Sequence, residues 1–439
     1  MNLALQDPFA VAKEYPDTLI TTLLYGASVV IEFNHRGDYL ASGLTDGTIV
    51  IYDLTANGAI VAKLSRHGHT RPVTLLGWSK CGRYLISSSQ DWSCKLWDLS
   101  LCNQPGSNKS AVIREVTFDG PIWQCYMNPL NPFQFAVSLL ENQPYYVDAT
   151  EEGIKITQLA TEPKLDANDE LGGGGGANKA KIEKHSTLVL TFTPDGKYIF
   201  TGTNKGWINI VDSHTLTTVH SIKLVNANIK NLVISSNNRK LVVNSSDRIV
   251  RQINLPDMYN VTNADLWEFE VEHRYQDLVN RLQWNSVAFN NNAEFLVAST
   301  YGQSSNDLYI WETSMGSLVK ILEGAVEELI DVKWNFPRCM IGSTGLDSGN
   351  IYLWSVQFPQ KWSALAPDFV EIEENIDYEE GEDEFDLVNE QDLNKKRMEA
   401  EDINLVDVTS REDVDARGFE LWEDSFVIRP NYYDGVVES

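Results

Sequence analysis

Several hallmarks of other protein classes are missing from this sequence. Its 439 residues include only five cysteines, which are scattered, form no CxxC pair and have no histidine at zinc-finger spacing. No segment approaches the ~18 consecutive apolar residues of a membrane helix. Residues 1–17 lack the charged region and the long apolar region of a secretory signal. We therefore expect an intracellular protein in a reducing compartment, with no membrane contact.

The common catalytic motifs are missing as well. The sequence has no GxSxG, no P-loop, no Gly-rich dinucleotide fingerprint after a strand and no HExxH. Its seven histidines are scattered. His67 and His69 could supply two metal ligands, but no third ligand is near them in sequence. We predict that the chain is not an enzyme and has no cofactor and no metal site.

Charge is unevenly distributed along the chain. The formal net charge is −27. Residues 360–439 contain 25 Asp and Glu against 7 Lys and Arg, which gives −18 and leaves −9 for the other 359 residues. Overall charge will therefore not draw the protein to nucleic acid. One cluster of basic residues could contact a phosphate group, although a solvated loop of mixed charge is the better interpretation. The cluster comprises Lys63, Arg66, His67, His69 and Arg71.

Seven similar units follow one another between residues 28 and 356. Each has an apolar strand, a turn, a second strand with small residues, another turn, and a third strand that ends in an apolar and then a polar residue. These ends are 45, 50, 64, 42, 58 and 43 residues apart, and a WD-repeat blade takes ~40–45 residues. The pattern predicts an all-β fold, a seven-bladed WD-repeat β-propeller, because a closed ring leaves no open sheet edge. The units are 29–54, 73–99, 121–149, 188–213, 229–255, 285–313 and 329–356.

We divide the chain into three parts. Residues 1–27 include a strand-like run that begins at Thr18, and we expect this run to close the ring as the outer strand of the last blade. Residues 28–358 form the propeller. Residues 359–439 form an extended acidic C-terminal tail that binds partners.

Two segments of the propeller are longer than a blade requires, and we interpret them as insertions. Residues 149–186 include five consecutive glycines, which cost too much entropy to order. Residues 255–284 are too apolar for an idle loop, so they either pack on the propeller rim or present a surface to a partner. The apolar residues are Trp267, Phe269, Tyr275 and Leu278.

The second unit carries the fullest WD signature, which comprises His69, Ser87, Asp91 and Trp97. A histidine, a serine and an aspartate together resemble a catalytic or metal-binding set. In WD-repeat proteins these groups hydrogen-bond one another inside a blade and so satisfy buried polar atoms. We expect that structural role here.

Residues 362–410 say most about function. An acidic run at 372–386 is too charged to pack a core, yet its apolar residues are spaced singly among the charges. This pattern is typical of a disordered strip that folds onto other proteins, and a solvated tail is the alternative. The 20 residues between Phe385 and Val406 would span ~25 Å as a flexible chain, so one tail could hold two neighbouring subunits.

Several motifs carry a resemblance to one family. They are SDRIVR at 246–251, QDLVNR at 276–281, GSLVKIL at 316–322, WSALAPDF at 362–369, ENIDYEEGEDEFD at 374–386 and VDVTS at 406–410. The chain resembles the propeller subunit of COMPASS-type (Set/MLL) histone H3 lysine-4 methyltransferase complexes, the retinoblastoma-binding protein five family, and a fungal member in particular.

The resemblance implies three binding segments in the tail. The first would bridge the catalytic SET domain and the SPRY domain of an Ash-two-like subunit, and comprises Trp362, Pro367, Asp368, Phe369, Glu373 and Asn375. The second would dock on that SPRY domain, and comprises Tyr378, Glu380, Glu382 and Phe385. The third would insert into a cleft on a second WD-repeat subunit, and comprises Leu405, Val406, Asp407, Val408 and Thr409.

The sequence departs from the family pattern at three places. Gly381 stands where a charged residue is usual, and RED follows VDVTS at 411–413 in place of a more apolar continuation. The segment 426–435, FVIRPNYYDG, matches weakly. For that segment we leave open a further contact with the propeller partner and packing on the chain itself.

The resemblance implies a non-catalytic nuclear scaffold that raises the activity of the methyltransferase subunit. The assembled complex would also bring the chain to the nucleosome. One alternative is a WD-repeat adaptor of another intracellular assembly, such as a ubiquitin ligase or a coat. A second is a propeller hydrolase, which needs a metal ion or an acid pair in the central channel.

Overall fold

The computed structural model describes residues 15–102, 110–140, 142–150, 153–164, 185–258, 267–277, 281–302, 306–335, 337–356, 394–395 and 426–428. The chain divides into two compact units, one of residues 1–12 with 358–424 and the other of residues 13–357 with 425–439. Only residues 394–395 of the first unit are described, so the fold below is that of the second. Within the described ranges, no helix has the length and apolar character needed to cross a membrane.

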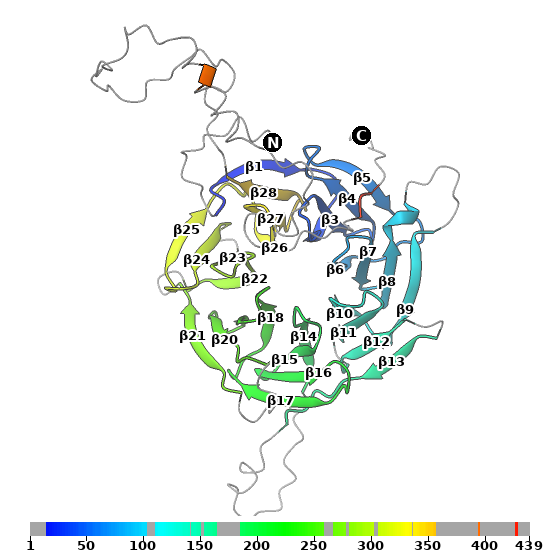
Figure 1. The fold of residues 1–439 in the computed structure, drawn as a ribbon, viewed down its shortest axis with the longest axis vertical. Helices are drawn as coiled ribbons and strands as arrows, with labels where there is room; N and C mark the ends of the chain where they lie inside the picture. Colours follow the sequence, from blue (N-terminus) through cyan, green and yellow to red (C-terminus); the bar gives the residue numbers. More distant parts are fainter. Residues whose placement is uncertain are drawn as a thin grey trace, which may run out of the picture. The chain divides into compact units, whose positions relative to one another are not determined.

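The described residues of the second unit form seven antiparallel sheets of four strands each, arranged as a ring of blades (Figure 1). This arrangement confirms the predicted all-β, seven-bladed β-propeller. The blades follow one another along the chain, and only the last blade takes a strand from the other end of the sequence.

The first four blades contain sixteen strands in chain order. Blade 1 contains β2 (Ser28–Phe33), β3 (Tyr39–Leu44), β4 (Ile49–Asp53) and β5 (Ala59–Leu64). Blade 2 contains β6 (Val73–Trp78), β7 (Tyr84–Ser89), β8 (Ser93–Asp98) and β9 (Val112–Thr117), with the 3₁₀ turn η2 (Leu99–Leu101) after β8. Blade 3 contains β10 (Ile122–Met127), β11 (Gln134–Leu139), β12 (Tyr145–Asp148) and β13 (Lys155–Gln158). Blade 4 contains β14 (Thr187–Phe192), β15 (Tyr198–Thr203), β16 (Trp207–Asp212) and β17 (Thr218–Lys223).

The other three blades complete the ring. Blade 5 contains β18 (Ile229–Ile234), β19 (Lys240–Ser245), β20 (Val250–Asn254) and β21 (Glu270–Tyr275). Blade 6 contains β22 (Gln283–Phe289), β23 (Phe295–Tyr301), β24 (Leu308–Glu312) and β25 (Leu318–Leu322). Blade 7 contains β26 (Leu329–Asn335), β27 (Met340–Gly345), β28 (Ile351–Ser355) and, as its outer strand, β1 (Thr18–Leu23).

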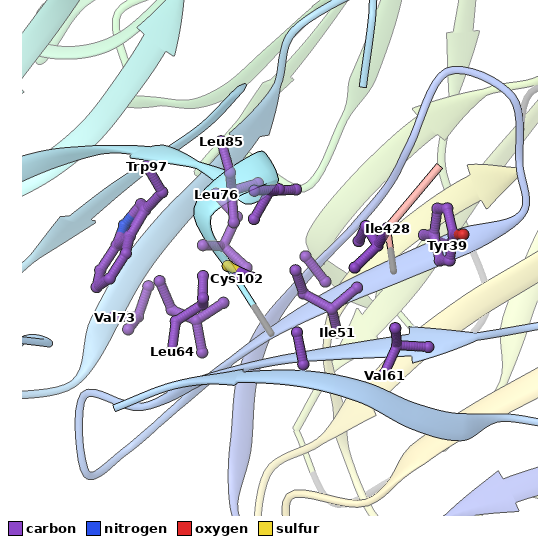
Figure 2. Close-up of a cluster of buried hydrophobic side chains, with 14 of the residues drawn as sticks. Tyr39, Ile51, Val61, Leu64, Val73, Leu76, Leu85, Trp97, Cys102 and Ile428 are labelled. Carbon is purple, nitrogen blue, oxygen red and sulfur yellow. The ribbon is translucent and has the colours of Figure 1, made fainter. Parts of the chain in front are cut away.

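The middle strands of the blades are apolar on both faces because a blade packs against a neighbour on each side. All residues of β3 and β4 are buried. Ile49 and Ile51 of β4 belong to a cluster that also contains Val73 and Trp97 of blade 2, which joins the two blades (Figure 2). Burying each such side chain stabilises the fold by about 1.5–3 kcal/mol.

A bulge recurs where the inner strand of each blade pairs with the second strand. In blade 1 the register shifts between Ser28 and Val30, and in blade 2 between Val73 and Leu75. The same shift occurs in the other five blades. Because a bulge increases the local twist of a strand, we expect the inner strand of each blade to be strongly twisted at this point.

The outer strands of blades 3 and 5 differ from the sequence-based interpretation. Residues 149–186 and 255–284 were interpreted as insertions, yet they contain β13 and β21, which complete their blades. The pattern was missed because outer strands face solvent. Three of the four residues of β13 are exposed, so the strand carries no apolar alternation.

The junction between blade 7 and blade 1, the seam, is held by the two ends of the propeller sequence. Strand β1 pairs antiparallel with β28, from Thr18 opposite Ser355 to Leu23 opposite Ile351. At the inner strands, Asp331 accepts a hydrogen bond from the Ile31 N–H at 3.2 Å. Strand β1 thus supplies the outer strand of the last blade and closes the ring.

A second group of seam contacts joins two turns. Arg338 donates to Asp38 at 2.7 Å, and Asn335 donates to the Gly37 carbonyl at 3.1 Å. Gly37 has a φ of +74°, and a Cβ atom there would lie 2.2 Å from the Asn335 Oδ1. Only glycine allows this close approach of the two blades.

Candidate interaction surfaces

The signature residues of blade 2 form one hydrogen-bonded chain. His69 Nδ1 lies 2.9 Å from Asp91 Oδ2, and His69 Nε2 lies 2.7 Å from Ser87 Oγ. The indole N–H of Trp97 donates to the same Ser87 Oγ at 2.8 Å. A neutral imidazole that donates from Nδ1 to Asp91 and accepts at Nε2 from the Ser87 hydroxyl satisfies every one of these groups. The chain therefore ties four separate segments of the blade together.

Burial decides between the structural and the catalytic interpretation of this chain. Asp91, His69 and Ser87 follow one another as in a hydrolase triad. Ser87, however, is 0% exposed, and its oxygen already accepts from Trp97. A nucleophile must reach a substrate carbonyl, and this hydroxyl reaches only the interior of a blade. The arrangement can stabilise the blade and cannot act on an external substrate.

Asp91 is held in its charged form. Burial opposes ionisation, but hydrogen bonds from His69, Ser93 and the Thr70 N–H outweigh it and hold the pKa of the Asp91 carboxyl well below its ordinary value. Across the described residues, no group of three or more His, Cys, Asp or Glu side chains is placed to hold a metal ion.

Blade 7 uses a glutamate where blade 2 uses its histidine, and the sequence analysis missed it. Glu327 is 8% exposed and accepts from the N–H groups of Asp347 and Ser348, each at 2.7 Å. Its other oxygen accepts from the Tyr352 hydroxyl at 3.1 Å. Burial opposes ionisation of Glu327, but the bonds from Ser348 and Asp347 lower its pKa. The signal available in the sequence was a glutamate shortly before strand β26. Its carboxylate caps the turn after β27.

A partly buried ion pair joins the inner strands of the first and last blades. Lys333 Nζ on β26 lies 2.6 Å from Glu32 Oε2 on β2. Burial raises the pKa of Glu32 despite this partner. Burial acts against the charge of Lys333, but the carboxylates of Glu32 and Asp331 outweigh it and raise the pKa of Lys333. The pair belongs to the ring closure.

The basic cluster between β5 and β6 is divided by the fold. His69 is buried inside blade 2, and Lys63 lies over the ring of Tyr25 at 4.4 Å. Arg66, His67 and Arg71 are exposed on the connecting turn. The cluster therefore presents three exposed side chains, with Lys63 half-buried and His69 withdrawn from solvent.

The apolar residues of segment 255–284 pack on the ring. Trp267 is 4% exposed and meets Tyr198 of blade 4 edge-on at 5.4 Å between ring centroids. Tyr275 is 2% exposed and donates to Gln252 Oε1. Phe269 packs against the same cluster as Trp267. Of the two interpretations left open, packing on the propeller rim holds for these three residues, whereas Leu278 lies outside the described residues.

A short piece of the C-terminal region is also packed on the ring. Ile428 is 1% exposed among residues of blade 1, including Tyr39, Ile51 and Val61 (Figure 2). The Phe426 N–H donates to the Cys81 carbonyl of blade 2 at 3.0 Å. Of the two interpretations left open for segment 426–435, a contact with the propeller partner and packing on the chain itself, the second holds for Phe426 and Ile428.

The three predicted binding segments of the tail lie outside the described residues. This applies to Trp362, Pro367, Asp368, Phe369, Glu373 and Asn375 of the first, to Tyr378, Glu380, Glu382 and Phe385 of the second, and to Leu405, Val406, Asp407, Val408 and Thr409 of the third. Their roles stay predictions, as does the division of the chain at residues 358 and 359.

Comparison with known proteins agrees with the propeller. A family model described as "WD domain, G-beta repeat" matches residues 20–53 and 60–98. COMPASS component SWD1 of Saccharomyces cerevisiae is 40% identical over 98% of this chain and 98% of its own length. Set1 complex component swd1 of Schizosaccharomyces pombe is 42% identical over 89% of this chain and 91% of its own.

The chain belongs to the Swd1/retinoblastoma-binding protein 5 family. The resemblance inferred from the sequence motifs is thereby confirmed. A more distant member, the retinoblastoma-binding protein 5 homolog of Drosophila melanogaster, is 31% identical over 95% of this chain and 78% of its own length. The relatives named above include components of COMPASS and Set1 complexes.

A solved structure of a family member has the same fold. The crystal structure of the Cps50 (Swd1) β-propeller domain of Myceliophteria thermophila superposes with a TM-score of 0.68 at 38% identity, covering 77% of this chain and all of that domain. Members of the Swd1/retinoblastoma-binding protein 5 family are complex subunits with a WD-repeat propeller, and this chain is a subunit of that kind rather than a catalytic enzyme.

Proposed function

We propose that the chain is a scaffold subunit of a COMPASS-type histone H3 lysine-4 methyltransferase complex, and that its tail activates the SET subunit. The observation that carries the proposal is similarity to yeast COMPASS component SWD1 over nearly the whole chain, acidic tail included. A propeller alone supports many functions, since a fold does not specify an activity. Similarity that extends beyond the ring into the tail favours the function of this one family among the many functions of propellers.

The first two tail segments account for activation. Residues 362–375 would contact both the SET domain and the SPRY domain, and residues 378–385 would add a dock on the SPRY domain. Binding both domains at once would hold the SET domain in its productive geometry, which is a positioning effect. The catalytic residues, the methyl-donor cofactor and the peptide cleft belong to other chains in this proposal.

The third segment accounts for assembly. Val406 and Val408 are two residues apart, so an extended strand directs both β-branched side chains to one side, as a cleft on a second WD-repeat subunit requires. Three modest contacts on one chain would bind jointly far more tightly than singly, because each raises the effective concentration of the next. Nuclear localisation and contact with the nucleosome through the assembled complex follow from this function.

Deletion of residues 362–410 from the chain tests the proposal. In a complex reconstituted from the SET, SPRY-domain and WD-repeat subunits, the deletion should abolish stimulation of H3 lysine-4 methylation. Thermal unfolding of the deleted chain should match that of the full chain, because the ring strands are intact. Unchanged stimulation would refute the scaffold mechanism and leave an adaptor of another assembly as the better interpretation.

A further inference from the structure

The segment Phe426–Ile428, the clip, lies far beyond the last blade strand and yet packs on the first two blades. Its side chains alternate as in an extended strand. Ile428 is 1% exposed and Phe426 packs against the same cluster, whereas Val427 between them is 62% exposed. The backbone takes part as well, since the Phe426 N–H donates to the Cys81 carbonyl. Side chains and backbone thus hold the clip in one register.

The groove that receives the clip is built mainly by blade 1. Besides the apolar contacts of Ile428 with the cluster, the clip borders a cavity of about 250 Å³ whose walls include Asn34, Arg36, Asp38 and Tyr39. Asp53, Thr55 and Val61 complete the wall. An apolar floor with a polar rim is suited to a short extended peptide with apolar anchors at positions i and i+2.

The chain leaves the ring close to the place where it returns. Ser355, near the point of exit, donates to the Cys339 carbonyl at 3.2 Å. The adjacent Arg338 donates to Asp38 of the turn 34–38. That same turn supplies Asn34, Arg36 and Asp38 to the cavity beside the clip. Exit and return are therefore connected through one turn, on the same face of the ring.

We propose that the clip closes residues 357–425 into a loop anchored to the ring at both ends, and that its groove is a binding site for a short apolar segment that the chain's own C-terminal region fills. In one respect the inference rests on the proposed function, because all three partner-binding segments lie inside the loop. A chain of 69 residues anchored at one end reaches about 240 Å, and a loop anchored at both ends reaches about half that distance. The clip thus halves the distance from the ring at which the chain can hold a partner.

Hydrogen exchange on the full-length chain, without any partner, tests the clip itself. The Phe426 amide should be protected in the wild type, and Ile428→Asp should remove this protection because a charge cannot enter the apolar groove. Ile428→Ala, a milder change, should reduce it at least tenfold. Val427→Asp is the matched control, since its side chain is exposed, and should leave protection unchanged. Equal exchange of this amide in all four proteins would overturn the proposal.

A labelled peptide of residues 424–431 tests the groove as a binding site. It should bind full-length Ile428→Asp at least tenfold more tightly than the wild type or Val427→Asp, where the groove is already filled. Affinity for Ile428→Asp no greater than for the wild type would overturn the assignment. A wild-type dimer that Ile428→Asp converts to a monomer would assign the groove to a second copy and would also overturn it. Because no methyltransferase subunit is present, these results are independent of the proposed function.

Discussion

Lys333 of the last blade lies 2.6 Å from Glu32 of the first blade, Nζ to Oε2, so the ring is closed at its inner strands by opposite charges. Nearby, Asp331 accepts from the Ile31 N–H of the same first blade. The outer edge of the same seam is closed by β1 on β28. The seam thus has an electrostatic inner contact and a backbone-paired outer contact.

Removing one charge of the inner pair should weaken the seam. Lys333→Met leaves the partly buried Glu32 carboxylate without its partner, and we expect the free energy of unfolding to fall by about 1–3 kcal/mol at pH 7. Urea denaturation measures this change. The double variant Lys333→Met with Glu32→Gln should recover most of the loss, because no unpaired charge stays buried. Equal stability of the single and double variants would contradict the assignment.

The same single variant should have a steeper pH dependence of stability than the wild type. Burial already raises the pKa of Glu32 above its ordinary value of 4.5, and loss of the lysine raises it further. The native state then binds more protons than the unfolded state, so the free energy of unfolding falls as pH rises above about 4.5. Relative to the wild type, Lys333→Met should be least impaired near pH 4. Urea midpoints of the wild type and Lys333→Met are compared between pH 4 and 8. A difference between the two proteins that stays constant over this range would argue against the expected pH dependence.

His69→Ala should destabilise blade 2. The change leaves Ser87 and Asp91 without their shared partner, and an unsatisfied buried polar group costs about 1–3 kcal/mol. Because hydrogen bonds hold the pKa of Asp91 below 3.8, their stabilisation is present above that pH and is lost as the pH falls below it. The variant should therefore lose less stability than the wild type between pH 4 and 2. His67→Asn, at an exposed position with a φ of +57°, is the control and should change stability little.

Strand β1 offers a matched pair of substitutions. Leu23 is 8% exposed and packs in the cluster of blade 1 and blade 7, so Leu23→Asp should lower the free energy of unfolding by at least about 3 kcal/mol. Ile20 of the same strand is 49% exposed, and Ile20→Asp should change it by less than about 0.5 kcal/mol. Thermal unfolding of both variants gives the comparison. A small effect of Leu23→Asp would mean that the ring closes without this strand.

The predicted SPRY dock can be tested apart from the other segments. Tyr378→Ala and Phe385→Ala should each weaken binding of the chain to the SPRY-domain subunit about thirtyfold, the effect of losing an anchor worth about 2 kcal/mol. Glu379→Gln, between two of the predicted contacts, should change affinity only severalfold. Calorimetric titration of the full-length chain measures all three. Wild-type affinity of both alanine variants would remove the second binding segment from the proposal.

The sequence predicted the three inner strands of each blade better than the outer one. Strand β4, with Ile49 and Ile51 in an unbroken apolar run, is buried on both faces and left a clear pattern. Strand β13 is paired on one side and mostly exposed, so Lys155 and Gln158 carry no burial signal. Its place is set by backbone pairing with β12, which side-chain pattern does not report.

Polar contacts between distant segments were partly predictable. His69, Ser87, Asp91 and Trp97 follow a known spacing, and their hydrogen bonds agree with it. Glu327 has a comparable role in blade 7, but a glutamate in an acidic loop resembles any solvated carboxylate until the turn that it caps is placed beside it. The docking of Ile428 depends on a contact between residues far apart in sequence, which local patterns cannot specify.

The pairing of β1 with β28 has a consequence for biosynthesis. Thr18 leaves the ribosome first among the ring residues, and its partner Ser355 follows 337 residues later. At roughly 5–20 residues per second, translation of that interval takes tens of seconds. During this time the nascent chain carries an unpaired apolar edge at each end of an open arc, the kind of surface that associates with other chains and that chaperones shield. Completion of the ring therefore comes late in the synthesis of this protein, after a period in which the chain is prone to associate with others.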